Sequence, residues 1–170
     1  QSAAGDREVD AGEVALALVG EEQHGRGHVL GLGDAPQRYG RLDALEATDE
    51  PAALRACGFS GQKVAYVKDL AARFHAGEVK PRRWRAMEDE AIIEELVAVK
   101  GIGRWTAEMF LLFHLARPNV LPVGDLGLQR AMERAYNGGD ALTKDEMRAI
   151  AATWHPFSSV GTWYMWRSLE

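Results

Sequence analysis

The chain of 170 residues is poor in several features that define whole classes of protein. Cys57 is its single cysteine, so no disulfide can form within the chain and no four-cysteine metal cluster can be held. No apolar run is long enough to cross a bilayer, and residues 1–4 do not resemble a signal peptide. Internal repeats, low-complexity tracts and convincing strand periodicity are also missing. We therefore expect an intracellular protein (cytoplasm or nucleoid) that tolerates a reducing compartment.

Positive charge is scarce as well. The chain has 20 Lys and Arg against 25 Asp and Glu, which gives a formal net charge of −5. Proteins that bind duplex DNA gain much of their affinity by neutralising phosphates, so this balance argues mildly against nucleic acid and confines any DNA-binding face to a local patch. The one dense basic and aromatic run is 80–85, where a solvated helix start is favoured over a binding patch.

Helical periodicity, by contrast, runs through the whole chain. With 46% hydrophobic residues, the protein can bury one core, or two lobes sharing a cleft, without metals or disulfides. Ser60 is a plausible N-cap, and Thr143 with Glu146 forms a capping-box pattern. These patterns predict an all-α fold with helices at 8–19, 49–57, 62–75, 89–99, 126–136, 143–154 and 158–168.

The segment 96–112 predicts two short helices joined by the turn Gly101-Ile102-Gly103. The two glycines lack Cβ, so the chain can take positive φ there and a phosphate can approach closely, while Ile102 can fill the joint between the helices. The bare amides at the start of the second helix would carry the positive end of its dipole toward an anion. A tight turn that binds no ligand is the alternative interpretation.

An acidic residue, Asp125, follows a Pro/Gly break and precedes an amphipathic helix in the segment 121–131. Aspartate is a favoured N-cap, so Asp125 can be explained by helix capping alone. A fixed carboxylate can also stabilise positive charge that develops in a reaction.

The combination of Gly-Ile-Gly-x-Trp-Thr-Ala with Pro-x-Gly-Asp-Leu-Gly-Leu about twenty residues later is highly specific. It resembles the helix-hairpin-helix DNA glycosylases of the 3-methyladenine DNA glycosylase II type, and the closing run 154–167 is similar to the end of that family's domain. The resemblance is close over 54–170 and poor before it. It implies a two-lobed helical fold with a DNA-binding cleft between the lobes. The whole of 1–170 would form one unit, with lobe one at about 8–117, including the hairpin 96–112, and lobe two at about 118–170.

The resemblance implies a monofunctional DNA N-glycosylase that excises alkylated purines in base excision repair. The substrate would be double-stranded DNA with damaged bases, the target base would flip out of the stack, and the protein would act as a monomer. Asp125 would be the catalytic residue, stabilising an oxocarbenium-like sugar and orienting the attacking water. A catalytically impaired DNA-binding relative is the alternative, and an unrelated helical interaction scaffold is a third hypothesis.

The family's pattern also assigns a base pocket and a DNA contact. Trp166 matches the aromatic residue that faces the catalytic aspartate, and Trp105 follows the hairpin, although core packing could explain each. Trp154 and Trp163 are assigned to the core. The expected DNA-binding residues are Lys100, Gly101, Ile102, Gly103, Arg104 and Thr106.

No side-chain metal site and no cofactor are expected, and in particular no iron–sulfur cluster of the endonuclease III branch. The family implies a monovalent cation, Na⁺ or K⁺, at the hairpin carbonyls. Superfamily members that also cut the backbone carry a Schiff-base lysine where this chain has Trp105, so we expect water as the nucleophile and an abasic site as the product. Lys100 is better interpreted as a phosphate contact.

Two departures from the family pattern stand out. Ser158 occupies a position where the family often has arginine. In the segment 21–39, two carboxylates, Glu21 and Glu22, and several glycines replace the helix that supplies the family's DNA wedge. The wedge is supplied elsewhere, or this copy is impaired, or the segment reflects a shifted reading frame. His24 and His28 have the spacing of a zinc pair, which we regard as a weak alternative.

Overall fold

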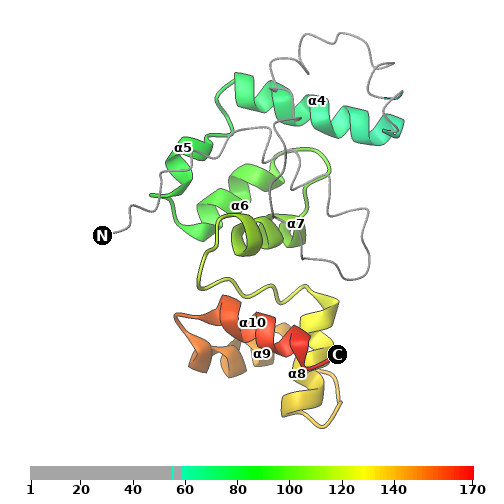
Figure 1. Ribbon diagram of the computed structural model, residues 1–170, viewed down its shortest axis with the longest axis vertical. Helices are drawn as coiled ribbons and strands as arrows, with labels where there is room; N and C mark the ends of the chain where they lie inside the picture. The colour runs from blue at the N-terminus through cyan, green and yellow to red at the C-terminus, as the bar shows by residue number, and fades with distance from the viewer. Residues whose placement is uncertain (1–54, 56–58) are drawn as a thin grey trace. The chain divides into compact units, whose positions relative to one another are not determined.

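The computed structural model describes Arg55 and residues 59–170, and every regular element among these residues is helical (Figure 1). The predicted helices at 8–19 and, apart from Arg55, at 49–57 lie outside the described residues, as does the segment 21–39. The all-α prediction is confirmed for the described part. Its elements are α4 (Gly61–His75), α5 (Pro81–Trp84), α6 (Asp89–Val97), α7 (Arg104–Met109), the π-helix η2 (Phe110–His114), α8 (Leu126–Tyr136), α9 (Lys144–Ala151), the 3-10 helix η3 (Ala152–Trp154) and α10 (Ser158–Arg167).

Helix ends fall where the capping residues predicted them. Ser60 caps α4, and its hydroxyl accepts the Lys63 N–H at 3.3 Å. The helix stops before Gly77, whose φ of +68° suits glycine. Thr143 and Glu146 form the predicted reciprocal capping box at the start of α9.

The chain divides into two compact units, Gln1–Ile102 and Gly103–Glu170. In the first unit, α4 buries Val64, Val67 and Leu70, and α6 buries Ile92, Ile93 and Leu96. The predicted lobe boundary at 117/118 and the cleft between lobes remain predictions.

The basic run 80–85 begins the short helix α5, with Pro81 at its first position. Its arginines are exposed, as expected for a solvated helix start, but Trp84 is buried and only 1% exposed. The Trp84 indole N–H donates to Glu95 Oε1 at 2.9 Å. This aromatic residue therefore belongs to the core of the first unit.

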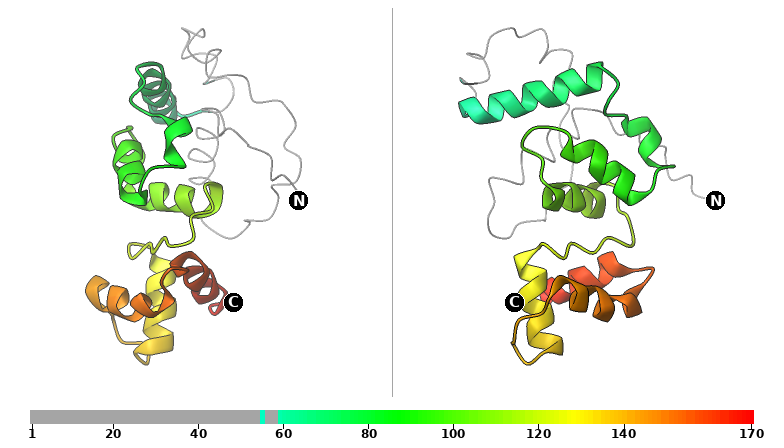
Figure 2. Two further views of the ribbon diagram at one scale, coloured as in Figure 1. Left: turned by 90° about the vertical axis from the view of Figure 1, so that its left-hand side faces the viewer. Right: turned by 180° about the vertical axis from the view of Figure 1, so that it is seen from behind.

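In the second unit, α8, α9 and α10 lie together in all three views (Figures 1 and 2). Leu128 and Met132 of α8 and Met147 of α9 are fully buried at the centre of its core. Trp154 is half-buried and packs against this cluster, in agreement with its assignment to the core.

The assignment of Trp163 to the core was wrong, because its side chain is 47% exposed. The inner face of α10 is formed by the small residues Ser158, Ser159 and Thr162, so helical spacing turns Trp163 outward. There its ring meets Tyr164 edge-on at 5.1 Å, and Arg167 lies 5.8 Å from its centroid.

The start of α10 is tied to the segment before α8. Ser159 Oγ donates to the Arg117 carbonyl at 2.5 Å and accepts the Val120 N–H at 2.9 Å. Ser158, which departs from the family's arginine, is buried and donates to Asn119 Oδ1 at 2.7 Å. This side chain therefore helps to set the direction of α10.

No helix in the described part is long and apolar enough to span a membrane.

Candidate active site

Asp125 stands at the N-terminus of α8, in the chain turn that follows Pro122. Its own amide donates to the Pro122 carbonyl at 2.8 Å, and its backbone is extended, with φ −76° and ψ 123°. Its Oδ1 accepts the Leu128 N–H at 2.6 Å, so the predicted N-cap is confirmed. The cap fixes where the carboxylate points.

Two tryptophans converge on the same carboxylate. The Trp166 indole N–H donates to Asp125 Oδ1 at 2.7 Å, and the Trp105 indole N–H donates to Oδ2 at 2.9 Å. A carboxylate offers about four acceptor positions over its two oxygens. Within the described part of the chain, Oδ1 accepts two N–H groups and Oδ2 accepts one, which leaves an acceptor position on Oδ2. The structure thus brings together the three residues that the sequence assigned to catalysis and the base pocket.

The approach of Trp166 depends on a glycine that the sequence analysis missed. A Cβ on Gly127 would lie 3.1 Å from Asp125 Oδ1 and 3.2 Å from Cδ1 of the Trp166 ring. Only a residue without a side chain fits there without displacing one of them. The sequence did contain an indication of this role, because glycine has a low helix propensity and yet stands in the first turn of a predicted amphipathic helix.

Phe113 is a second residue that sequence reasoning missed. It lies in the π-helix η2 and stacks on Trp166, with ring centroids 5.9 Å apart and an interplanar angle of 18°. Stacking of this kind stabilises an aromatic pair. Trp105 is 43% exposed, so it too offers accessible aromatic surface beside the carboxylate.

The two hairpin glycines have different reasons to be glycine. Gly101 has φ +85°, and a Cβ there would lie 2.3 Å from the ring of Tyr66, which packs against it. Gly103 has φ −88°, and a Cβ there would meet no atom of the described residues within 4 Å. The expectation of positive φ is confirmed at Gly101 and wrong at Gly103, where open space is the feature that a ligand could use.

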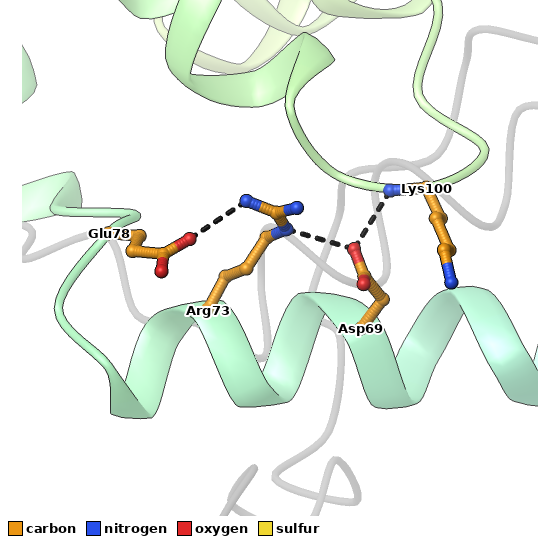
Figure 3. A network of polar contacts seen from close by, with 4 residues as sticks. All are labelled: Asp69, Arg73, Glu78 and Lys100. Carbon is orange, nitrogen blue, oxygen red and sulfur yellow. Dashed lines mark hydrogen bonds and ion pairs between the residues drawn. The ribbon is translucent and has the colours of Figure 1, made fainter.

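The expectation of a ring of bare amides needs correction at two positions. The Lys100 N–H donates to Asp69 Oδ2 of α4 at 2.9 Å, and the Ile102 N–H donates to the Val99 carbonyl at 3.2 Å. Figure 3 shows Asp69 and Arg73 rising from α4 toward the turn. Both the Lys100 amide and, more weakly, the Arg73 guanidinium lower the pKa of Asp69 below its ordinary value.

The predicted DNA-binding side chains differ in their partners. Arg104 Nε lies 3.0 Å from Oε1 of Glu108, a buried carboxylate that the sequence analysis did not single out. The pairing offsets part of the charge that Arg104 could offer a phosphate. Lys100 is exposed, whereas Ile102 and Thr106 are half-buried.

No cluster of three or more histidine, cysteine or acidic side chains that could hold a metal occurs among the residues that the structure describes. The pair His24 and His28 lies outside that part of the chain.

A family model, described as HhH-GPD superfamily base excision DNA repair protein, matches residues 36–156. The chain belongs to this family. The helix-hairpin-helix fold of the family also agrees with solved structures. The chain is similar to DNA-3-methyladenine glycosidase from Bacillus halodurans, with 33% identity and a TM-score of 0.71 over 76% of this chain and 60% of that one. It also shares its fold with Schizosaccharomyces pombe 3-methyladenine DNA glycosylase in complex with abasic DNA, at 24% identity and a TM-score of 0.70 over 98% and 85% of the two chains.

Among sequence relatives in the HhH-GPD superfamily, the chain is 34% identical to DNA-3-methyladenine glycosylase 1 of Schizosaccharomyces pombe over 117 residues, or 68% of this chain and 51% of that protein. The chain spans between 41% and 51% of the length of three curated relatives.

Proposed function

We propose that this chain is a DNA N-glycosylase of the 3-methyladenine class, acting in base excision repair on double-stranded DNA. The observation that carries the proposal is the Asp125 carboxylate, held by three N–H donors from α8, Trp105 and Trp166. The names of its relatives support the same reaction class. A protein with this substrate would work inside the cell, as the sequence predicts.

The reaction follows from the charge of the site. Breaking an N-glycosidic bond leaves positive charge on the sugar, and a carboxylate in fixed position stabilises that charge as it forms. The three donors that the described part of the chain gives to Asp125 are neutral N–H groups, so they orient the carboxylate without cancelling its charge. The acceptor position left on Oδ2 can orient or deprotonate a water molecule that attacks the sugar carbon. The base departs as the C–N bond breaks, the water oxygen bonds to the sugar carbon and gives a proton to Asp125, and the product is an abasic site.

The two indoles favour a particular kind of base. A flipped base stacks on aromatic faces, and the faces of tryptophan attract cations through their quadrupole. Alkylated purines such as 3-methyladenine carry positive charge and have weakened glycosidic bonds. Trp105, with its exposed ring, and Trp166, whose indole N–H binds the same carboxylate, therefore suit this substrate class better than neutral bases.

The hairpin is the proposed contact to the DNA backbone. Gly101, the open space at Gly103 and the flanking Lys100 suit a phosphate that carries no sequence information. The expected Na⁺ or K⁺ is compatible with the turn, because the Val99 carbonyl accepts the Ile102 N–H and a carbonyl oxygen has two lone pairs. Such a cation would supply positive charge next to the phosphate.

The test of the proposed function is release of the damaged base from methylated duplex DNA, followed by detection of the abasic site. We expect the rate of 3-methyladenine release to rise linearly with the protein concentration. A protein that retains the duplex but releases no base would instead be the catalytically impaired DNA-binding relative, and Asp125 would then be a helix cap alone.

The hydrolytic route has its own test. Borohydride reduction during turnover should trap no protein–DNA adduct, because Trp105 stands in place of the Schiff-base lysine and attack by water forms no imine. Recovery of a covalent adduct would contradict this route and direct attention to Lys100.

A further inference from the structure

The turn of the hairpin is fixed by two side chains of α4, Tyr66 and Asp69, which we call the hairpin support. The Tyr66 ring lies against Gly101, close enough that a Cβ at that glycine would overlap it. Asp69 Oδ2 accepts the Lys100 N–H at 2.9 Å. Tyr66 and Asp69 are three residues apart in one helix, so they lie on the same face of α4.

Each member of the support is itself held in place. Gln62 Nε2 donates to the Tyr66 hydroxyl at 2.6 Å, one helical turn earlier. Arg73 Nε donates to Asp69 Oδ2 at 3.0 Å, and Arg73 also contacts Glu78 Oε2 at 2.8 Å (Figure 3). The chain of contacts runs from Glu78 through Arg73 to Asp69 and ends on the backbone of the turn.

Glycine loses more backbone freedom on ordering than any other residue, so a turn that contains Gly101 and Gly103 needs outside contacts to keep one conformation. The pKa of Asp69 is lowered, first by the hydrogen bond from the Lys100 amide, which agrees with a carboxylate that holds the backbone of the turn.

We propose that Asp69 is a positioning residue for DNA binding: it holds the Lys100 backbone, and with it the turn between α6 and α7, in the conformation that receives a DNA phosphate. This inference rests on the proposed function, because it assigns α4 a role in the affinity of the same hairpin. Asp69 itself touches no DNA.

Electrostatics alone predicts that loss of the Asp69 carboxylate raises the affinity for DNA, whereas the positioning role predicts that it lowers the affinity. DNA is strongly negative, so removing a carboxylate near its contact surface should tighten binding. Glu78 provides the matched control, since Glu78→Ala removes the same charge from the same Arg73 and leaves the turn untouched. Asp69→Ala should weaken affinity for undamaged duplex about fivefold, the loss expected for one hydrogen bond. Glu78→Ala should leave affinity unchanged or raise it.

A conservative variant and an amide measurement sharpen the test. Asp69→Asn keeps an oxygen that can accept the Lys100 N–H, so it should restore most of the affinity lost in Asp69→Ala. Hydrogen exchange of the Lys100 amide should speed up in Asp69→Ala and stay at the original rate in Glu78→Ala. Asp69→Ala should raise the Kd for duplex and leave the single-turnover rate at saturating duplex unchanged.

The outcomes separate this inference from the function on which it rests. If the unchanged protein binds duplex and Asp69→Ala binds as tightly as Glu78→Ala, the positioning role is wrong and the proposed function stands. An unchanged exchange rate at Lys100 in Asp69→Ala would also overturn it. If the unchanged protein binds no duplex, the proposed function fails and the inference fails with it.

Discussion

Asp69 and Asp125 each accept a backbone N–H, but the side-chain donors to the two carboxylates differ in charge. Each accepts a backbone N–H, from Lys100 in one case and Leu128 in the other, and each accepts side-chain N–H groups as well. At Asp69 the side-chain donor is the charged guanidinium of Arg73. At Asp125 the side-chain donors are the neutral indoles of Trp105 and Trp166.

The comparison teaches how a carboxylate is assigned to structure or to chemistry. A carboxylate paired with a cation has its charge offset, so it suits the holding of backbone. A carboxylate oriented by neutral donors keeps its charge for a positive centre that forms later. Substitutions at these two aspartates and in the elements around them can break or sharpen this distinction.

The largest effect is expected at Asp125. Asp125→Asn removes the charge and keeps a side chain that caps α8 well, so base release should fall by about 10²-fold or more while folding and duplex binding persist. Single-turnover excision measures the loss of base release, and thermal melting measures whether the fold persists. Excision at the original rate would end the catalytic assignment of Asp125.

The next effect concerns Trp166. Trp166→Ala removes an aromatic face, so excision of cationic 3-methyladenine should fall about 2- to 30-fold more than excision of neutral hypoxanthine, corresponding to about 0.5–2 kcal/mol of cation–π attraction. Trp166→Phe keeps a face and loses the N–H to Asp125, and so separates stacking from orientation. Equal losses on both bases in a protein that melts far lower would show that Trp166 only supports the fold.

The third effect separates the two hairpin glycines. Gly101→Ala must place a Cβ on a left-handed backbone and against Tyr66, so it should cost roughly 1–2 kcal/mol of stability and weaken duplex binding. A Cβ at Gly103 meets no atom of the described residues within 4 Å, so Gly103→Val should fold normally and weaken binding to every DNA sequence alike. Loss of affinity for a single damaged base, with normal binding to undamaged duplex, would contradict a backbone contact.

The smallest effect is the pH dependence at Asp69. Its pKa is lowered in the folded protein, so its stabilising contribution is present above the ordinary carboxyl pKa of about 3.9 and is lost as the pH falls through the folded value. Urea midpoints of the original protein and Asp69→Asn should differ at pH 7 and pH 5, and the difference should shrink as the pH falls below the ordinary carboxyl pKa. Glu146, whose pKa is lowered first by the Thr143 amide, should give the same trend in Glu146→Gln.

The sequence predicted those parts of the fold that depend on local rules. Ser60, Thr143 and Asp125 each cap the helix expected of them, because capping needs one side chain and the amides that follow it. The meeting of Trp105 and Trp166 at Asp125 came from the family resemblance, since no local pattern brings together residues 41 positions apart in the chain.

The features that the sequence analysis placed wrongly or did not find depend on tertiary packing. Trp163 was placed in the core on its hydrophobicity, but the small residues on the inner face of α10 turn it outward. Phe113 reaches Trp166 from a π-helix, whose spacing differs from that of the α-helix assumed for the hairpin. The bond from the Lys100 amide to Asp69 joins residues 31 positions apart, and nothing in either local sequence indicates it.

Gly127 has a consequence for engineering this protein. A glycine-to-alanine change inside a helix is a common stabilising substitution, worth about 0.5–1 kcal/mol, and α8 offers one in its first turn. Here the added methyl group would press on Asp125 Oδ1 and on the Trp166 ring at once. Gly127→Ala would therefore shift the carboxylate or the indole by a few tenths of an ångström, so selection for heat resistance at this position acts directly on the geometry of the candidate active site.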